Sequence, residues 1–143
     1  MAPGSMRRPG PNPEASPPHE EVPVSTHAMT YVKDEEGTTL VAIYRHSDGY
    51  PLGHGLELKS IIEKTKRADM GCLAASIVAK LKTEPREVYL YPIDTKPEDR
   101  GANYVYTVYE QDEVLQITVD NMRDVIFDGP VSEFDPAAVQ VRR

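Results

Sequence analysis

The chain has 143 residues, of which 39% are hydrophobic and 27% are charged, so it can form one domain with a single core. Its formal net charge of -7 argues against a dedicated nucleic-acid-binding protein, because phosphate contacts need clustered Lys and Arg. No apolar run approaches the roughly 18 residues that cross a bilayer, and the single cysteine excludes an intrachain disulfide. We therefore expect a soluble, cytoplasmic protein with no membrane partner.

Prolines are concentrated at the N-terminus, where seven of the 13 precede residue 28. This stretch has few apolar side chains to bury, so it predicts a disordered, partly polyproline II arm over residues 1–28. A single folded domain is expected over residues 29–134, followed by a short C-terminal tail at 135–143. A proline-rich arm can also bind an aromatic groove, although a solvated tail is the commoner role.

The first half of the folded region predicts two strands followed by two helices. Apolar and β-branched runs indicate strands at residues 29–33 and 38–45, with a turn between them. Apolar side chains at helical spacing then predict helices over about residues 54–66 and 70–81. The second helix carries several small residues, so we expect it to be the most buried helix, with Cys72 in its packing.

The second half predicts strands bounded by Pro, Gly, Asp and Asn. They are expected at residues 88–91, 103–110, 114–120 and 125–127. Asp135 and Pro136 suit the start of one more helical turn, since Pro is favoured at the first position of a helix. The order β-β-α-α-β-β-β-β predicts an α+β fold, in which two helices pack on one face of an antiparallel sheet.

The segment between the second strand and the first helix is the one stretch that resembles a binding site. Gly49 is expected to supply a positive φ, and Pro51 holds Tyr50 extended. Gly53 and Gly55 are expected to leave the first amides of the helix open to an anion. The candidate ligand-binding residues are Arg45, His46, Asp48, Gly49, Tyr50, Gly53, His54 and Gly55.

The same glycines have a purely structural explanation, because a tight turn alone requires them. The segment has no Gly-Lys-Ser/Thr sequence, so it is not a nucleotide-hydrolase phosphate loop. Arg45, His46 and His54 are the residues that the turn geometry leaves unexplained.

The sequence of this segment also resembles that of other proteins. The run Tyr44-Arg45-His46-Ser47-Asp48-Gly49-Tyr50-Pro51, followed by two glycines and a leucine-rich helix, is similar to a family of small bacterial and bacteriophage proteins mostly called hypothetical. Further similar runs begin at Met70, Tyr89, Asn103 and Phe127, so the resemblance covers about residues 38–134. It implies a phage- or prophage-type accessory protein, in the host cytoplasm if phage-encoded, and brings no catalytic residue. Family members usually have an aromatic residue in place of Ser47, so a stacking role there is not carried over.

Two kinds of chemistry compete with a binding role at the turn. A small hydrolase or nucleotide-processing enzyme could use His46, Asp48 and His54 for acid-base catalysis, but the sequence contains no nucleophile in a recognisable setting. A metal site formed by the same three residues with Cys72 matches none of the recurring zinc spacings. We expect no cofactor and no metal, and we favour a non-enzymatic protein that binds a protein partner or a small anionic ligand.

Tyrosines form a second pattern, with eight in the chain against two phenylalanines and no tryptophan. Tyr89 and Tyr91 point to one side of their strand, away from Val88 and Leu90, because strand side chains alternate. If the aliphatic side meets the helices, the tyrosines face solvent or a partner. Mutual support of tyrosines across the sheet is the commoner arrangement, and a protein contact, including self-association, is the more specific hypothesis.

Overall fold

The computed structural model describes residues 26–65 and 69–140 of the chain. The predicted N-terminal arm therefore lies outside the described residues as far as residue 25. Among the described residues, no helix is long and apolar enough to span a membrane.

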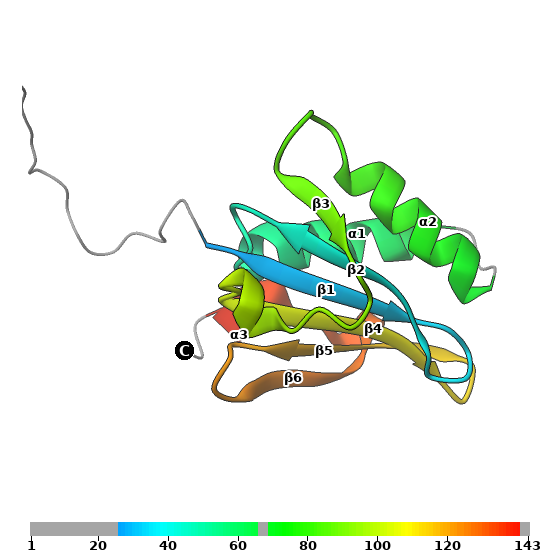
Figure 1. Cartoon of the computed structure of the whole chain (residues 1–143). Coiled ribbons are helices and arrows are strands. Elements are labelled where there is room, and N and C mark those ends of the chain that lie inside the picture. Colours follow the sequence, from blue (N-terminus) through cyan, green and yellow to red (C-terminus); the bar gives the residue numbers. More distant parts are fainter. Residues whose placement is uncertain (1–25, 66–68, 141–143) are drawn as a thin grey trace, which may run out of the picture.

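Six strands form one sheet in the order β3-β2-β1-β4-β5-β6 (Figure 1). Neighbouring strands are antiparallel except for β1 and β4, which pair in parallel at the centre of the sheet. The strands are β1 (Ala28–Lys33), β2 (Thr39–Arg45), β3 (Val88–Tyr91), β4 (Tyr104–Gln111), β5 (Val114–Asp120) and β6 (Val125–Pro130). The predicted strands are all present, and the central parallel pair makes the sheet mixed rather than wholly antiparallel.

The predicted helices are also present, with several short additions. The α-helices are α1 (Leu56–Lys64), α2 (Met70–Leu81) and α3 (Pro136–Gln140). A π-helical turn, η2 (Pro51–Gly55), leads directly into α1, and short 3-10 helices occur at η3 (Pro97–Arg100) and η4 (Val131–Glu133). The α+β prediction is confirmed.

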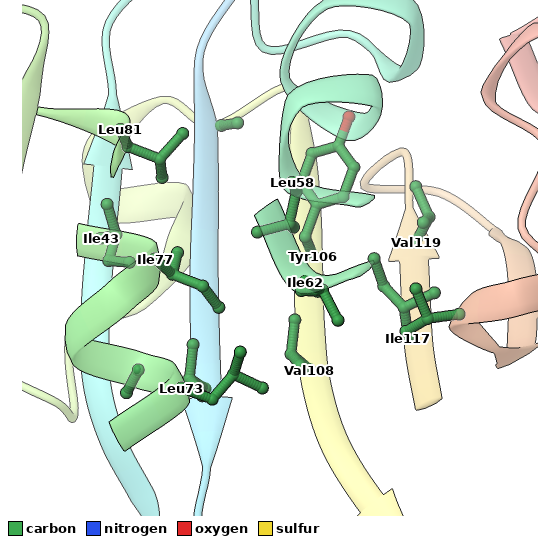
Figure 2. Close-up of a cluster of buried hydrophobic side chains, with 14 of the residues drawn as sticks. Ile43, Leu58, Ile62, Leu73, Ile77, Leu81, Tyr106, Val108, Ile117 and Val119 are labelled. Atoms are coloured by element: carbon green, nitrogen blue, oxygen red, sulfur yellow. The ribbon is translucent and has the colours of Figure 1, made fainter. Parts of the chain in front are cut away.

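The main core lies between the sheet and the α-helices. Buried side chains of α1, α2 and α3 pack there against alternate side chains of the strands. Figure 2 shows Ile77 of α2 beside Ile43 of β2, and Leu58 of α1 beside Tyr106 of β4. Each of these four side chains is less than 1% exposed. This spacing follows from the sequence, since apolar residues recur every three to four positions in the helices and every two in the strands.

One expectation about the helices is wrong. Cys72 is exposed, and so are Gly71, Ala75 and Ala79, because α2 packs on the sheet by one side only. The expected C-terminal tail includes α3, whose Val139 is buried in the main core. The Asp135 carboxylate accepts a hydrogen bond from the backbone N–H of Ala137, as expected for a cap before Pro136.

The opposite face of the sheet carries a smaller cluster of apolar side chains around Met29, Ala42 and Tyr44. The connection from β3 to β4 crosses part of this face. Its Thr95 carbonyl accepts a hydrogen bond of 2.6 Å from the Tyr31 hydroxyl, and its Ala102 packs in the cluster. We call this side the open face, because the buried side chains of α1, α2 and α3 belong to the other side.

Candidate functional site

The turn after β2 reverses the chain by a different geometry from the one expected. Asp48, rather than Gly49, takes the positive φ, at 60°. Gly49 is needed because a Cβ there would lie 2.8 Å from the Ala28 Cβ and from the His27 backbone carbon. Tyr50 is extended, with φ -72° and ψ 162°, as expected for a residue before proline. The prediction of a positive φ at Gly49 is therefore wrong, whereas that for Tyr50 is confirmed.

The backbone amides at the helix start are not open to an anion. The Gly53 and Gly55 amides donate to the Tyr50 carbonyl, at 2.9 and 3.5 Å, and the His54 amide donates to the Asp48 carbonyl at 2.8 Å. The Leu52 amide donates to the Gln140 side-chain oxygen at 2.8 Å. The expected open amides at Gly53–Gly55 are thus occupied by oxygen atoms of the chain itself.

Arg45 is held inside the turn by acceptors of the same chain. Its Nε donates to the Ser47 carbonyl at 2.7 Å, and its guanidinium forms an ion pair with Glu57 of α1. The Asp48 carboxylate lies 4.0 Å away on the other side. Two carboxylates therefore surround one cation, and the arrangement clamps the turn to α1.

His54 points into the main core and has no exposed surface. Its Nε2 lies 2.6 Å from the hydroxyl of Thr30, which is also buried, and its Nδ1 lies 3.5 Å from an Arg45 nitrogen. Since arginine only donates, Nδ1 acts as the acceptor and Nε2 carries the proton. Burial, with a further contribution from the Arg45 charge, lowers the pKa of His54 to about 3. At neutral pH His54 is an uncharged structural residue.

The core around His54 explains the glycine at position 55. The His54 ring meets the Tyr106 ring edge-on, at 4.8 Å between centroids, and the Tyr106 hydroxyl donates to the Gly49 carbonyl at 2.7 Å. A Cβ on Gly55 would lie 3.3 Å from the Tyr106 ring and 3.2 Å from the Phe134 ring. Burial raises the pKa of Tyr106 well above its usual value, so this donor keeps its proton.

His46 lies on the open face, apart from His54. Its ring stacks on the His27 ring at 4.8 Å between centroids, and its Nδ1 lies 3.1 Å from the Tyr44 hydroxyl. His46 is exposed, whereas Tyr44 is 9% exposed. The alternation of side chains along β2 puts both on the face opposite Arg45, so the turn separates the two histidines that the sequence places together.

Five rings from three chain segments contact one another here and form what we call the aromatic patch. Tyr44 is at its centre, within 6.1 Å of each of the other four ring centroids. The members of the aromatic patch are His27, Tyr44, His46, Tyr89 and Tyr91. Tyr89 and Tyr91 face away from the helices, as expected, since Val88 lies in the main core and Tyr91 packs against the cluster on the open face, although Leu90 is 56% exposed.

Two cations lie at the rim of the aromatic patch. The Arg100 guanidinium is 4.7 Å from the centroid of the Tyr91 ring, and the Lys82 ammonium is 5.4 Å from that of Tyr89. Both distances permit cation-π attraction. The patch thus combines half-exposed rings with two cations, and the Glu87 carboxylate also acts on its central ring, Tyr44.

Sequence reasoning identified Tyr89 and Tyr91 by strand alternation but missed His27, Tyr44 and Arg100 as their neighbours. Pairing of β2 with β3 brings Tyr44 directly opposite Tyr89. Strand alternation alone could have placed Tyr44 and His46 on one face, but the order of the strands was needed to bring that face to Tyr89. Within residues 26–65 and 69–140, no group of three or more His, Cys, Asp and Glu side chains could hold a metal ion.

Comparisons with protein-family models, with curated proteins and with solved structures found no match to this chain. The resemblance to small bacterial and bacteriophage proteins therefore stays a prediction.

Proposed function

We propose that this chain is a non-enzymatic interaction protein that binds a protein partner through the aromatic patch. The observation that carries the proposal is the mutual contact of five rings on the open face, with Tyr89 41% exposed and His46 exposed beside it. Tyrosine gives protein interfaces large apolar contact together with a polar end, and aromatic residues are enriched there. The partner surface thus includes His46 of the turn segment and extends from it toward β3.

A protein partner is favoured over a small anion at the turn. The amides of Gly53, His54 and Gly55 already donate to carbonyl oxygens of the chain. The Arg45 guanidinium has Glu57 as its partner and Asp48 nearby, so an incoming anion would meet two carboxylates. An anion site at the turn would require these contacts to break first.

The hydrolase alternative has less support from the geometry. It needs His46, Asp48 and His54 to reach one substrate, yet His54 is fully buried against Thr30 and His46 lies on the open face. An acid-base pair must lie within hydrogen-bonding reach of the same proton. The three residues therefore do not form a shared reaction centre in this structure.

The proposal also includes an accessory role of phage or prophage type, which the sequence resemblance alone supports. The order of genes beside the coding sequence tests it. Structural or packaging genes of a phage as neighbours would support this part of the proposal, and a conserved setting among unrelated metabolic genes would contradict it.

The binding proposal is tested by affinity capture from an extract of the source cells. The Tyr89→Ser/Tyr91→Ser double variant is expected to lose the captured partner while keeping the melting temperature of the unmodified chain within a few degrees. Tyr109→Ser is the matched control, because Tyr109 lies on the same side of the sheet as Tyr44 but pairs with Asp128 rather than with the patch. Equal capture by all three proteins would overturn the proposal.

A further inference from the structure

The described chain begins at the aromatic patch. Thr26 is fixed by the Gly49 amide, which donates to its carbonyl at 2.9 Å, and the His27 carbonyl accepts from the Asn103 amide at the same distance. The His27 ring nitrogen Nδ1 donates to the His46 carbonyl at 2.5 Å. These contacts anchor the chain so that residues 1–25 join it at the edge of the patch.

The sequence of that preceding segment suits an aromatic surface. Prolines occur at positions 9, 11, 13, 17 and 18, and Glu14 is the single charged residue between Pro9 and Pro18. Proline-rich segments bind exposed aromatic rings in a preformed extended conformation, which lowers the entropy lost on binding. Glu14 carries a negative charge toward a patch that has Lys82 and Arg100 at its rim.

The tether is long enough for the segment to return to the patch. An extended chain spans at most about 3.3–3.6 Å per residue, so the residues between Pro18 and Thr26 reach roughly 25 Å. The ring centroids of Tyr89 and Tyr91 each lie about 6 Å from that of Tyr44. The reach therefore exceeds the distance from Tyr44 to either ring, and the high effective concentration of a short tether favours contact.

We propose that the aromatic patch binds a proline-rich segment and that its occupant in this chain is the chain's own segment Pro9–Pro18. The inference rests on the proposed function, since it assigns an occupant to the same patch. Proline rings pack on Tyr89 and Tyr91, and Glu14 lies toward the two cations. A protein partner then has to displace this internal ligand, so partners of the patch are expected to be proline-rich themselves.

The test uses the full chain with a nitroxide label at Ser16→Cys, in a Cys72→Ser background that removes the exposed native thiol. We expect the label to weaken the amide NMR signals of His46, Tyr89 and Tyr91 strongly, and those of Thr118 and Asp128, near Tyr109, far less. The matched control carries the same label with Pro9, Pro11, Pro13, Pro17 and Pro18 replaced by Ser. Its tether has the same number of residues, so the loss of signal at the patch is expected to disappear.

Equal signal loss with and without the prolines would show that the tether alone brings the label near, and would overturn the inference. A mixture of labelled unenriched chain and unlabelled isotope-enriched chain tests a second copy as the occupant. Signal loss at the patch in that mixture would overturn assignment to the same chain. If Tyr89→Ser/Tyr91→Ser abolishes partner capture while the label has no proline-dependent effect, the inference fails and the proposed function stands. If the label has a proline-dependent effect but no partner is captured, the inference stands and the proposed function fails.

Discussion

The two faces of the sheet use aromatic and histidine side chains for different purposes. On the helix side, Tyr106 and His54 are fully buried, and each has a polar partner within 2.7 Å. On the open face, Tyr44 is nearly buried, whereas Tyr89 and His46 expose much of their surface. The same residue types thus complete a core on one side and form the partly exposed aromatic patch on the other.

The difference arises at a single turn, which sends one histidine to each side. His54 belongs to a π-helical turn that packs on Thr30 and Tyr106, whereas His46 continues the alternation of β2 onto the open face. Close spacing in the sequence therefore says little about shared chemistry when a strand ends between the two residues. The face on which a side chain lies decides whether it can meet a partner.

The largest expected effect comes from replacing a tyrosine by alanine on each face of the sheet. Tyr106→Ala is expected to lower the free energy of unfolding by about 3–5 kcal/mol, because it leaves a cavity in the core and removes the donor to the Gly49 carbonyl. Tyr89→Ala, on the open face, is expected to lower it by less than about 1 kcal/mol. Urea unfolding measures both. Losses of equal size would contradict the division into a core face and a contact face.

The next effect tests the close approach that joins the turn to β1. Gly49→Ala is expected to lower the free energy of unfolding by about 1–3 kcal/mol, since its Cβ would lie 2.8 Å from the backbone of His27. Gly71→Ala is the control, because Gly71 is an exposed helix residue with nothing closer than the Asp69 carboxylate at 3.5 Å. It is expected to be neutral or to stabilise by up to about 1 kcal/mol. A harmless Gly49→Ala would contradict the close approach of the turn to β1.

Because His54 is buried and uncharged, the free energy of unfolding is expected to fall in acid. The pKa of His54 is about 3 in the folded chain, against 6.5 for an unperturbed histidine, so below pH 6.5 the unfolded chain takes up a proton that the folded chain does not. Between pH 7.5 and 5.5 this difference lowers the free energy of unfolding by about 1.4 kcal/mol. The loss continues as the pH falls toward 3.

Urea unfolding at each pH measures this slope. His54→Gln is expected to flatten it, whereas His46→Gln, which changes the exposed histidine, is expected to leave it nearly unchanged. If His54→Gln does not fold, the ring proton shifts of His54 in the unmodified chain serve instead and should stay those of a neutral ring at pH 5. A protonated His54 ring at that pH would contradict its burial.

Most of the fold could be predicted because its signals are local. The helical spacing of Leu73 and Ile77 and the alternation along β4 are physical requirements of packing against one face. The parallel pairing of β1 with β4 could not be predicted in this way, since it depends on the long connection after β3 passing over β2 and β1. Local periodicity says which face is buried but not which strand lies beside which.

The site was harder to predict because its polar groups could be satisfied in two ways. Glycines at 49, 53 and 55 suit an open anion site and a close-packed turn equally well in sequence. The structure uses them for close packing, with the Asp48 carbonyl only 2.5 Å from the place that a Gly53 Cβ would take. The amides of Gly53, His54 and Gly55 donate to nearby carbonyls, whereas the partner of the Leu52 amide is Gln140, 88 residues away, which no local pattern indicates.

The smallest expected effect concerns anion binding at the turn after β2. Inorganic phosphate at millimolar concentration is expected to leave the melting temperature unchanged, because the amides of Gly53 and His54 have partners and Arg45 is paired with Glu57. A ligand that binds the folded state alone stabilises it by RT ln(1 + [L]/Kd), so a thermal-shift measurement detects binding once the phosphate concentration exceeds its Kd several times. Sodium chloride at equal ionic strength controls for general salt effects. A rise specific to phosphate that is lost in Arg45→Ala would show that the turn opens to an anion after all, and the contact surface would then extend to both sides of the sheet.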